Sequence, residues 1–579
     1  MSASAPRVAV GLLGAGVGLA GLAMVGLPAF YESFLYLIFS WIALATSWSL
    51  LSGYAGYFSF GHGAFFGAGM YATATLTTAF DVPFLATLPV AGALAALLGT
   101  GIGAVVFRVQ RLRGELFGLL TLAVGFVLAT IVLNTRIDGG PGVYLSAVPL
   151  PRLLSSPTGT LYLLGLALAV ATVGTAYAIA HSRLGLGLYA IHDDEDVAEG
   201  KGVPTFAYKL LAFALSAGIA GVAGAIHAMY VSYVTVGETF SITVPLYVVL
   251  MSVLGGARHW LGPAVGATII AASLYAFTGG QQAVLGRAAV ALGLILVILL
   301  LPEGVVPAVL ARWRRWRPRP PDVVPITGAA PTAAVPGAAL ACAEIWRAFG
   351  GIQALRGVSL DVGPGEIVGL VGPNGSGKTT LINVISGYYA ADRGRVRLGD
   401  ATLTGRAAHE IAALGVGRTY QIPRPFGHFS ALDNVALAAV FGGAQLTPRQ
   451  ARAEARDWLA FIGLGQRAAA LPAELNLHER KFLELARALA ARPRVILLDE
   501  VLSGLNPAEI AGAIRLIQQI RARGVAVLFV EHLMRAVLEL CDRVVVLNEG
   551  AVIATGTPHE AMRAERVVEV YLGKAAAHA

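Results

Sequence analysis

The sequence predicts a two-part fold, in which a polytopic α-helical membrane domain of about ten spans precedes an α/β domain with a phosphate-binding loop. Two observations support this prediction. The first half of the 579-residue chain is mostly Leu, Ala, Val, Gly and Ile, in runs of about 20 residues that are long enough to cross a bilayer. The second half has the charge balance of a globular protein and contains GPNGSGKT (372–379) between a strand-like and a helix-like segment.

The chain is predicted to have three parts, with a membrane domain at 1–311, a linker at 312–340 and an α/β domain at 341–579. The linker begins with RWRRWRPR, which suits a membrane surface, and continues with Pro and Ala, which favour an extended spacer. The formal net charge of the chain is +8. Because cytoplasmic ends of membrane helices favour Arg and Lys, we attribute this charge to membrane-flanking positions and not to nucleic-acid binding.

The membrane domain holds about ten candidate spans. The segments at 57–80 and 242–257 leave a re-entrant or broken helix open as an alternative. The positive-inside rule places the N-terminus and the loop 181–207 in the cytoplasm. The first segment is long and no cleavage site follows it, so we predict a membrane helix there and not a signal peptide. The candidate spans are 8–27, 34–52, 57–80, 84–106, 117–134, 158–180, 208–231, 242–257, 261–280 and 284–301.

Isolated polar residues give weaker signals. Cys342 and Cys541 make neither a disulfide framework nor a metal motif, and are predicted to be free thiols. His62 is a lone ionisable residue in an apolar segment. Its flanking glycines, Gly61 and Gly63, favour a structural hydrogen bond over a ligand role.

The glycine-rich stretch in the second half predicts binding of ATP with Mg²⁺. EIVGLV precedes it and TLINVISG follows it, which is the strand–loop–helix context of a phosphate-binding loop. Backbone N–H groups at a helix N-terminus bind phosphates, Lys378 reaches the β- and γ-phosphates, and the Thr379 hydroxyl ligates Mg²⁺. Phe349 is a candidate for stacking on adenine, although a core aromatic residue is the alternative. The predicted ATP-binding residues are Phe349, Gly372, Asn374, Gly375, Ser376, Gly377, Lys378, Thr379 and Thr380.

Three further stretches carry candidate catalytic groups. RVILLDE (494–500) is a buried strand ending in two carboxylates, of which Asp499 suits Mg²⁺ and Glu500 suits a general base that polarises the attacking water. His532 follows another apolar strand and is placed to contact a γ-phosphate. Gln421 is placed to reach both Mg²⁺ and the attacking water.

These motifs, in this order, resemble an ATP-binding-cassette (ABC) ATPase. The second half resembles more narrowly the ATPases of branched-chain amino-acid importers, and the first half resembles the permease of the same system, so permease and ATPase look fused. The stretches that carry the resemblance are GPNGSGKT, Gln421, LELARALA (483–490), ILLDE (496–500), SGLNP (503–507) and His532, then FGGIQALRGVSL (349–360), GLNPAE (504–509), EHLM (531–534) and YLG (571–573), and in the first half 50–74, 208–226 and 253–267.

The resemblance implies an ATP-driven importer of branched-chain or hydrophobic amino acids in the bacterial cytoplasmic (inner) membrane, with the ATPase domain in the cytoplasm. It implies as partners a second permease subunit, a second ABC ATPase subunit, an extracytoplasmic solute-binding protein and the lipid bilayer. A homodimer of the fused chain is the alternative. Relatives of this kind also carry urea, short amides or aromatic acids. An alternative of another class is a membrane-tethered regulatory ATPase that moves no solute.

The loop 181–207 is the predicted contact between the two domains. It is long and charged, and long ordered loops are usually functional. We therefore predict a short amphipathic helix that docks on the ATPase, against the alternative of a solvated loop. The predicted coupling residues are Asp193, Asp194, Glu195, Asp196, Glu199 and Gly200.

The sequence departs from the family at the signature that contacts the γ-phosphate bound by the opposite ATPase. In LNLHE (475–479) only Leu475 matches the usual LSGGQ, and the residues that follow it are Asn476, Leu477, His478 and Glu479. Glu479 would repel a γ-phosphate there, although Asn476 could still donate a hydrogen bond to it. Directly after Glu500, Val501 stands where the family usually has Pro or Ala. The departure predicts an asymmetric pair of ATP sites, in which the site completed by LNLHE works more slowly or only binds.

Overall fold

The computed structural model describes residues 5–109, 114–138, 140–154, 156–277, 288, 291–292, 295–296, 299–316 and 337–572. They belong to two units, and the predicted two-part fold class is confirmed. The helical unit is Met1–His192 with Thr205–Arg319, and the α/β unit is Asp193–Pro204 with Pro320–Ala579. The predicted domain limits at 311 and 341 stay a prediction, because 317–336 lie outside the described residues.

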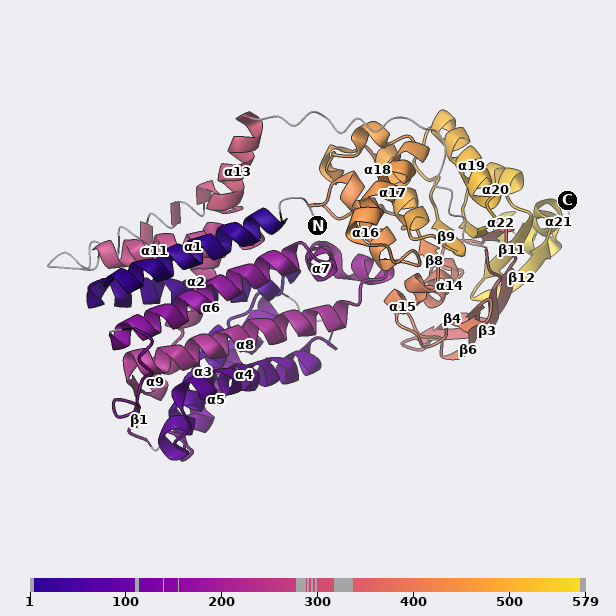
Figure 1. Ribbon diagram of the computed structural model, residues 1–579. Coiled ribbons are helices and arrows are strands. Elements are labelled where there is room, and N and C mark those ends of the chain that lie inside the picture. The colour runs from indigo at the N-terminus through magenta and orange to yellow at the C-terminus, as the bar shows by residue number, and fades with distance from the viewer. Residues whose placement is uncertain are drawn as a thin grey trace. The chain divides into compact units, whose positions relative to one another are not determined.

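Apolar helices make up most of the helical unit, and α1, α2, α6 and α8 lie side by side (Figure 1). Proline precedes or opens several of them, as at Pro28, Pro83 and Pro157, where a missing N–H costs nothing. The helices are α1 (Ala5–Val25), α2 (Ala29–Ala55), α3 (His62–Ala79), α4 (Phe84–Val106), α5 (Glu115–Leu133), α6 (Pro157–Ala180), α8 (Thr205–Val231), α9 (Val236–Thr239), α10 (Thr243–Gly255), α11 (Gly262–Phe277) and α13 (Val305–Trp316), with the short strands β1 (Val143–Tyr144) and β2 (Tyr233–Val234).

Seven described segments are long and apolar enough to cross a membrane. Of the predicted spans, 57–80 begins as a helix only at His62, and 242–257 is the short helix α10 preceded by α9. Most of the predicted span 284–301 lies outside the described residues. The seven segments are Arg7–Val25, Ala29–Ala55, Phe84–Val106, Glu115–Leu133, Pro157–Ala180, Thr205–Val231 and Val236–Gly255.

Close helix packing depends on glycine where α3 meets α8. A Cβ at Gly69 would collide with the carbonyl group of Gly221, and one at Gly224 would collide with that of Phe66. Small residues let helices in a membrane approach this closely. In the same region Nε2 of the buried His62 lies 3.1 Å from Oγ of Ser47.

The α/β unit contains two sheets. A six-stranded sheet has the order β12-β11-β5-β10-β9-β8, and all neighbours in it are parallel except β12 and β11. An antiparallel sheet has the order β4-β3-β6-β7. The strands are β3 (Leu340–Phe349), β4 (Ile352–Val362), β5 (Ile367–Val371), β6 (Arg393–Leu398), β7 (Ala401–Thr402), β8 (Val416–Arg418), β9 (Val495–Asp499), β10 (Ala526–Val530), β11 (Arg543–Asn548) and β12 (Ala551–Gly556).

Three helices of this unit, α16 to α18, form a group of their own (Figure 1). Side chains of both sheets share one apolar core, which includes Leu340, Val368 and Leu528. The helices are α14 (Lys378–Ile385), α15 (Ala408–Ala413), α16 (Ala431–Phe441), α17 (Pro448–Phe461), α18 (Leu477–Ala490), α19 (Pro507–Arg521), α20 (Met534–Leu540), α21 (Pro558–Arg563) and α22 (Glu565–Leu572), with the 3-10 turns η1 (Gly465–Arg467) and η2 (Pro472–Glu474).

Helix α7 (Arg183–Gly200) belongs to both units. It is broken at Asp194, whose φ of −161° and ψ of 102° are not helical. The side chain of Asp194 accepts a hydrogen bond of 3.1 Å from the backbone N–H of Val197, and so caps a short second helix. The loop predicted at 181–207 is therefore mostly helical. We call its second part, Asp193–Pro204, the docked segment.

Candidate functional site

The phosphate-binding loop joins β5 to α14. Because β5 is a central, fully buried strand with parallel neighbours on both sides, the loop lies where the carboxyl ends of β9 and β10 also meet. Three loop residues need positive φ, with values of +154° at Gly372, +79° at Gly375 and +105° at Gly377. Glycine adopts these angles without a Cβ clash, so the sequence can form this loop.

The side chains of the loop fit a phosphate ligand. The ammonium group of Lys378 donates hydrogen bonds of 2.8 and 2.9 Å to the carbonyl groups of Gly372 and Pro373. Oγ of Ser376 is buried without a hydrogen-bond partner, which is costly unless a ligand supplies one. Asn374 and Thr379 are exposed at the same loop. Polar donors thus surround a position at the N-terminus of α14, where an anion is favoured.

The three predicted catalytic side chains meet in the structure. Oε2 of Glu500 accepts a hydrogen bond of 2.6 Å from Nε2 of Gln421. Oε1 of the same carboxylate lies 3.0 Å from Nε2 of His532. Glu500 has a φ of 48°, an uncommon backbone angle that turns it out of the end of β9. Both carboxylate oxygens are therefore held by residues far apart in the sequence.

The charged groups of the site favour a bound cation. Burial raises the pKa of Asp499, with Arg418 acting in the opposite direction. Burial also lowers the pKa of Lys378, with Glu500 and Asp499 opposing the shift. A cation placed beside a buried carboxylate restores its charged form. Mg²⁺ would fit against Asp499, with Thr379 and Gln421 as further oxygen ligands, because it is commonly bound by one or two carboxylates together with substrate phosphates.

Phe349 lies at the end of β3, 37% exposed. The guanidinium group of Arg347 lies 4.7 Å from its ring centre, and Tyr389 packs edge-on at 5.0 Å. Its ring thus already packs against these two side chains. Adenine stacking on Phe349 stays a prediction.

Two charged residues near the site escaped the sequence argument. The Lys481 ammonium group donates hydrogen bonds to the carbonyl groups of Glu500, Val501 and Ser503, and so holds the loop after β9. Glu531 accepts a hydrogen bond of 2.7 Å from the backbone N–H of Leu502, and burial raises its pKa to about 7. The only sequence signal was their position next to motif residues.

The divergent signature forms the start of α18. The Asn476 side chain accepts a hydrogen bond of 2.8 Å from the backbone N–H of Glu479, and the Glu479 carboxylate accepts one of 2.9 Å from that of Asn476. This reciprocal arrangement is a capping box. The other oxygen of Glu479 lies 3.1 Å from Nε of Arg467. A carboxylate of the chain itself therefore occupies this helix N-terminus. His478 packs against Phe482, and Leu477 is half exposed.

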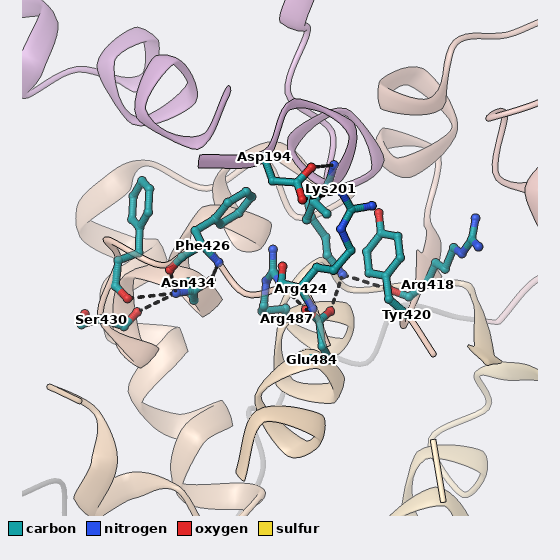
Figure 2. A network of polar contacts seen from close by, with 12 residues as sticks. Asp194, Lys201, Arg418, Tyr420, Arg424, Phe426, Ser430, Asn434, Glu484 and Arg487 are labelled. Atoms are coloured by element: carbon teal, nitrogen blue, oxygen red, sulfur yellow. Dashed lines mark hydrogen bonds and ion pairs between the residues drawn. The ribbon is translucent and has the colours of Figure 1, made fainter. Parts of the chain in front are cut away.

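The docked segment contacts the α/β unit through charged and aromatic groups (Figure 2). Asp194 lies 2.6 Å from the guanidinium group of Arg424. Both the backbone N–H and Nδ1 of His428 contact the carboxylate of Asp193, and the Tyr388 hydroxyl donates a hydrogen bond to the Asp196 carbonyl group.

Of the remaining predicted coupling residues, Glu199 and Gly200 lie at this contact. Glu199 is 3.7 Å from Nδ1 of His409, and Glu195 is buried. A Cβ at Gly200 would collide with the hydroxyl groups of Tyr388 and Tyr420, so this position has no room for a side chain. The contact itself is described, whereas a coupling role stays a prediction.

Comparisons with known proteins agree with both halves. Residues 30–302 match the family described as the permease component of the branched-chain amino acid transport system, and residues 355–503 match the ABC transporter family. The high-affinity branched-chain amino acid transport ATP-binding protein LivG of Escherichia coli (strain K12) is 37% identical over 241 residues, which cover 39% of this chain and 94% of LivG.

Two further relatives resemble the ATPase half. The lipopolysaccharide export system ATP-binding protein LptB of Acidithiobacillus ferridurans is 39% identical over 219 residues, which cover 38% of this chain and 90% of LptB. The crystal structure of a nucleotide-free ATP-binding cassette from an ABC transporter is 30% identical, with a TM-score of 0.38, over 40% of this chain and 98% of that one.

Proposed function

The chain is an ABC transporter of the branched-chain amino acid permease family with its ATPase fused in the same polypeptide, and we propose that it imports branched-chain or other hydrophobic amino acids across the bacterial cytoplasmic membrane. The direction and the substrate class rest on the permease match over 30–302. The ATPase half alone decides neither, since its relatives include LivG and the export protein LptB.

The observation that supports coupled transport best is the docked segment. It lies in the chain between two candidate spans, α6 and α8, yet it packs within the α/β unit. A movement of the ATPase would therefore act directly on the ends of two membrane helices. ATP binding would close two ATPase domains on each other, and access to a path between the membrane helices would alternate.

The residues of the site have distinct roles in this proposal. Bound ATP with Mg²⁺ supplies the phosphate bond whose hydrolysis drives transport. Lys378 offsets the charge of the phosphates. Glu500 polarises the attacking water and accepts its proton. Gln421 and His532 hold the two oxygens of Glu500, which fixes the orientation of this base.

We propose that the chain works with a second permease subunit, a second ATPase subunit and an extracytoplasmic solute-binding protein. The start of α18 favours an unequal pair of ATP sites. The capping box and the ion pair with Arg467 hold the carboxylate of Glu479 at the helix N-terminus, where the partner's γ-phosphate would need a donor. The site completed by LNLHE would then hydrolyse ATP slowly or only bind it. A homodimer would carry this defect at both sites.

Uptake measurements test the proposed substrate. The full chain is expressed with the products of its neighbouring genes in cells that lack their own systems, and labelled leucine, valine, phenylalanine, urea and benzoate are offered. Saturable leucine or valine uptake that disappears in Lys378→Ala is the expected result, because that change removes the ammonium group at the phosphates.

Other results would redirect the proposal. Uptake of urea or benzoate alone would keep the transport mechanism and replace the substrate class. ATP hydrolysis without uptake of any of the five solutes would favour the membrane-tethered regulatory ATPase. The exposed Arg449, changed to Met, is the control for loss of a positive charge elsewhere in the α/β unit.

A further inference from the structure

Lys201 is a buried cation in the docked segment, with 4% of its surface exposed. Its ammonium group donates a hydrogen bond of 2.9 Å to the carbonyl group of Arg418 and lies 3.4 Å from Oε2 of Glu484, as Figure 2 shows. The ring of Tyr420 packs over it at 5.4 Å. One side chain of the segment therefore contacts two separate elements of the α/β unit.

Both of these elements lead to the ATP site. Arg418 ends β8, and Gln421, the partner of Glu500, follows it by three residues. The guanidinium group of Arg418 lies 3.9 Å from the carboxylate of Asp499. Glu484 lies on α18, whose first turn is the divergent signature.

The charge balance around Lys201 argues against a role in simple anchoring. Glu484 is its carboxylate neighbour, but Arg487 already pairs with Glu484. Arg487 and Arg418 both oppose the lysine's charge, and burial lowers its pKa to about 8. Because Arg487 would still pair with Glu484, an apolar side chain of similar length at position 201 would leave no buried carboxylate without a cation. The positive charge of Lys201 is therefore expected to have a role other than strengthening the docking of the segment.

We propose that Lys201 is a positioning residue that transmits the nucleotide state of the ATP site to the docked segment, through Glu484 of α18 and the carbonyl group of Arg418. The proposal rests on the proposed function only in taking the segment as the route to the membrane helices. A shift of α18 or of the strand end at Arg418 changes the two contacts that this ammonium group makes. The segment then moves with the ATP site and is not merely attached beside it.

Hydrogen exchange on the full-length chain in detergent tests the proposal without any knowledge of the solute. Exchange of residues 193–204 is measured with and without ATP and Mg²⁺ in a Glu500→Gln background, which slows turnover. In that background, ATP is expected to change the exchange rate of the segment by at least about threefold. This change corresponds to roughly half of the free-energy difference that a tenfold change represents. Lys378→Ala, which weakens ATP binding, should abolish the response.

Lys201→Met carries the decisive comparison, with Arg449→Met as the matched control for a lost positive charge. Without nucleotide, the Lys201→Met segment should exchange within about twofold of the parent or more slowly, since Glu484 keeps Arg487 as its partner. The response to ATP should fall at least about threefold in Lys201→Met and stay unchanged in Arg449→Met.

Three results would overturn the proposal. One is an undiminished response to ATP in Lys201→Met. Another is a segment that loses protection in Lys201→Met without nucleotide, because the lysine would then be an anchor. The third is a parent chain that binds ATP with no response at 193–204. Each of these can occur whether or not leucine is transported, so failure of this proposal is distinct from failure of the proposed function.

Discussion

Gly200 and Lys201, two neighbouring residues of the docked segment, illustrate how single residues determine the contact of the segment with the rest of the α/β unit. Gly200 leaves room for the hydroxyl groups of Tyr388 and Tyr420, and these rings lie against the cation of Lys201 or of Arg418. A larger residue at 200 would separate the segment from this aromatic pair. In the pattern GKG at 200–202, Gly200 therefore allows the backbone to approach the two tyrosines closely, and Lys201 supplies one long charged side chain. Gly202, with a φ of +98°, ends the helix.

The pKa of Lys201 makes docking depend on pH. Its value falls from 10.5 to about 8 on burial, so above pH 8 the undocked segment binds more protons than the docked one. Linkage then strengthens docking as pH rises. The groups that face the Lys201 ammonium are Glu484, Arg487, Arg418 and the Tyr420 ring. Burial acts to raise the pKa of Glu484, but the charges of Arg487 and Lys201 outweigh it and the pKa is lowered. Protection of 193–204, measured by hydrogen exchange, should rise roughly tenfold between pH 7 and pH 9.

The same pH series in Lys201→Met separates this linkage from the intrinsic pH dependence of exchange. Methionine does not titrate, so its segment should show only the intrinsic change. Protection that falls with pH in the parent chain relative to Lys201→Met would contradict the expected sign.

Motif spacing identified three candidate catalytic residues that lie together in the structure, but it gave little signal for the residues that support them. Glu500, His532 and Gln421 each stand at a recognisable distance from a strand or from the phosphate-binding loop, and the structure brings them together. Lys201 and Lys481 have no such signal, because their partners come from segments that only the fold brings near.

At the scale of elements, the N-terminus of α18 is capped by side chains of its own sequence. The helix starts at Leu477 because Asn476 and Glu479 form a capping box. The pattern Asn-x-x-Glu predicts such a box by itself.

Replacement of the cap should destabilise the α/β unit by a predictable amount. Asn476→Ala removes the acceptor for the Glu479 backbone N–H, and loss of such a cap costs about 1 kcal/mol. The free energy of unfolding, measured by denaturant titration of the full chain with tryptophan fluorescence, should fall by about that amount.

Glu479→Gln is the matched control. Glutamine still accepts from the Asn476 backbone N–H, and only the partly exposed ion pair with Arg467 is lost. That loss should stay below about 0.5 kcal/mol. A larger effect of Glu479→Gln than of Asn476→Ala would show that the ion pair, and not the cap, holds the start of α18.

At the scale of the whole chain, composition was sufficient for the fold class but not for the grouping of its parts. Long apolar runs and one phosphate-binding loop predicted both halves. The docked segment lies inside the range 1–311 yet packs in the α/β unit, and no local pattern reveals that, because the charges of Asp193–Glu199 suit solvent as well as a partner. The first residues of the predicted linker, 312–316, belong to the helix α13 (Val305–Trp316).

Substitutions of the catalytic carboxylates test the proposed inequality of the two ATP sites. In the proposed heteromer, the site built on Lys378 and Glu500 is completed by the partner's signature, whereas the partner's loop meets LNLHE. If the second of these sites is slow, most hydrolysis passes through Glu500, and Glu500→Gln in the assembled complex should lower the ATPase rate about a hundredfold, the usual contribution of a general base.

The equivalent change in the partner's catalytic carboxylate supplies the comparison, because it should lower the rate less than about twofold when the LNLHE site contributes little. A nearly unchanged rate in Glu500→Gln would mean that the site facing Asn476 and Glu479 carries turnover, and the asymmetry would be refuted. If the purified complex contains only this chain, both sites face LNLHE, so Glu500→Gln removes the base from both sites and leaves no unchanged site to contribute hydrolysis. Subunit composition, measured on the same sample, therefore decides which of the two assemblies the ATPase rate describes. A slow rate that depends on Glu500 in the homodimer would show that a capped α18 still supports catalysis.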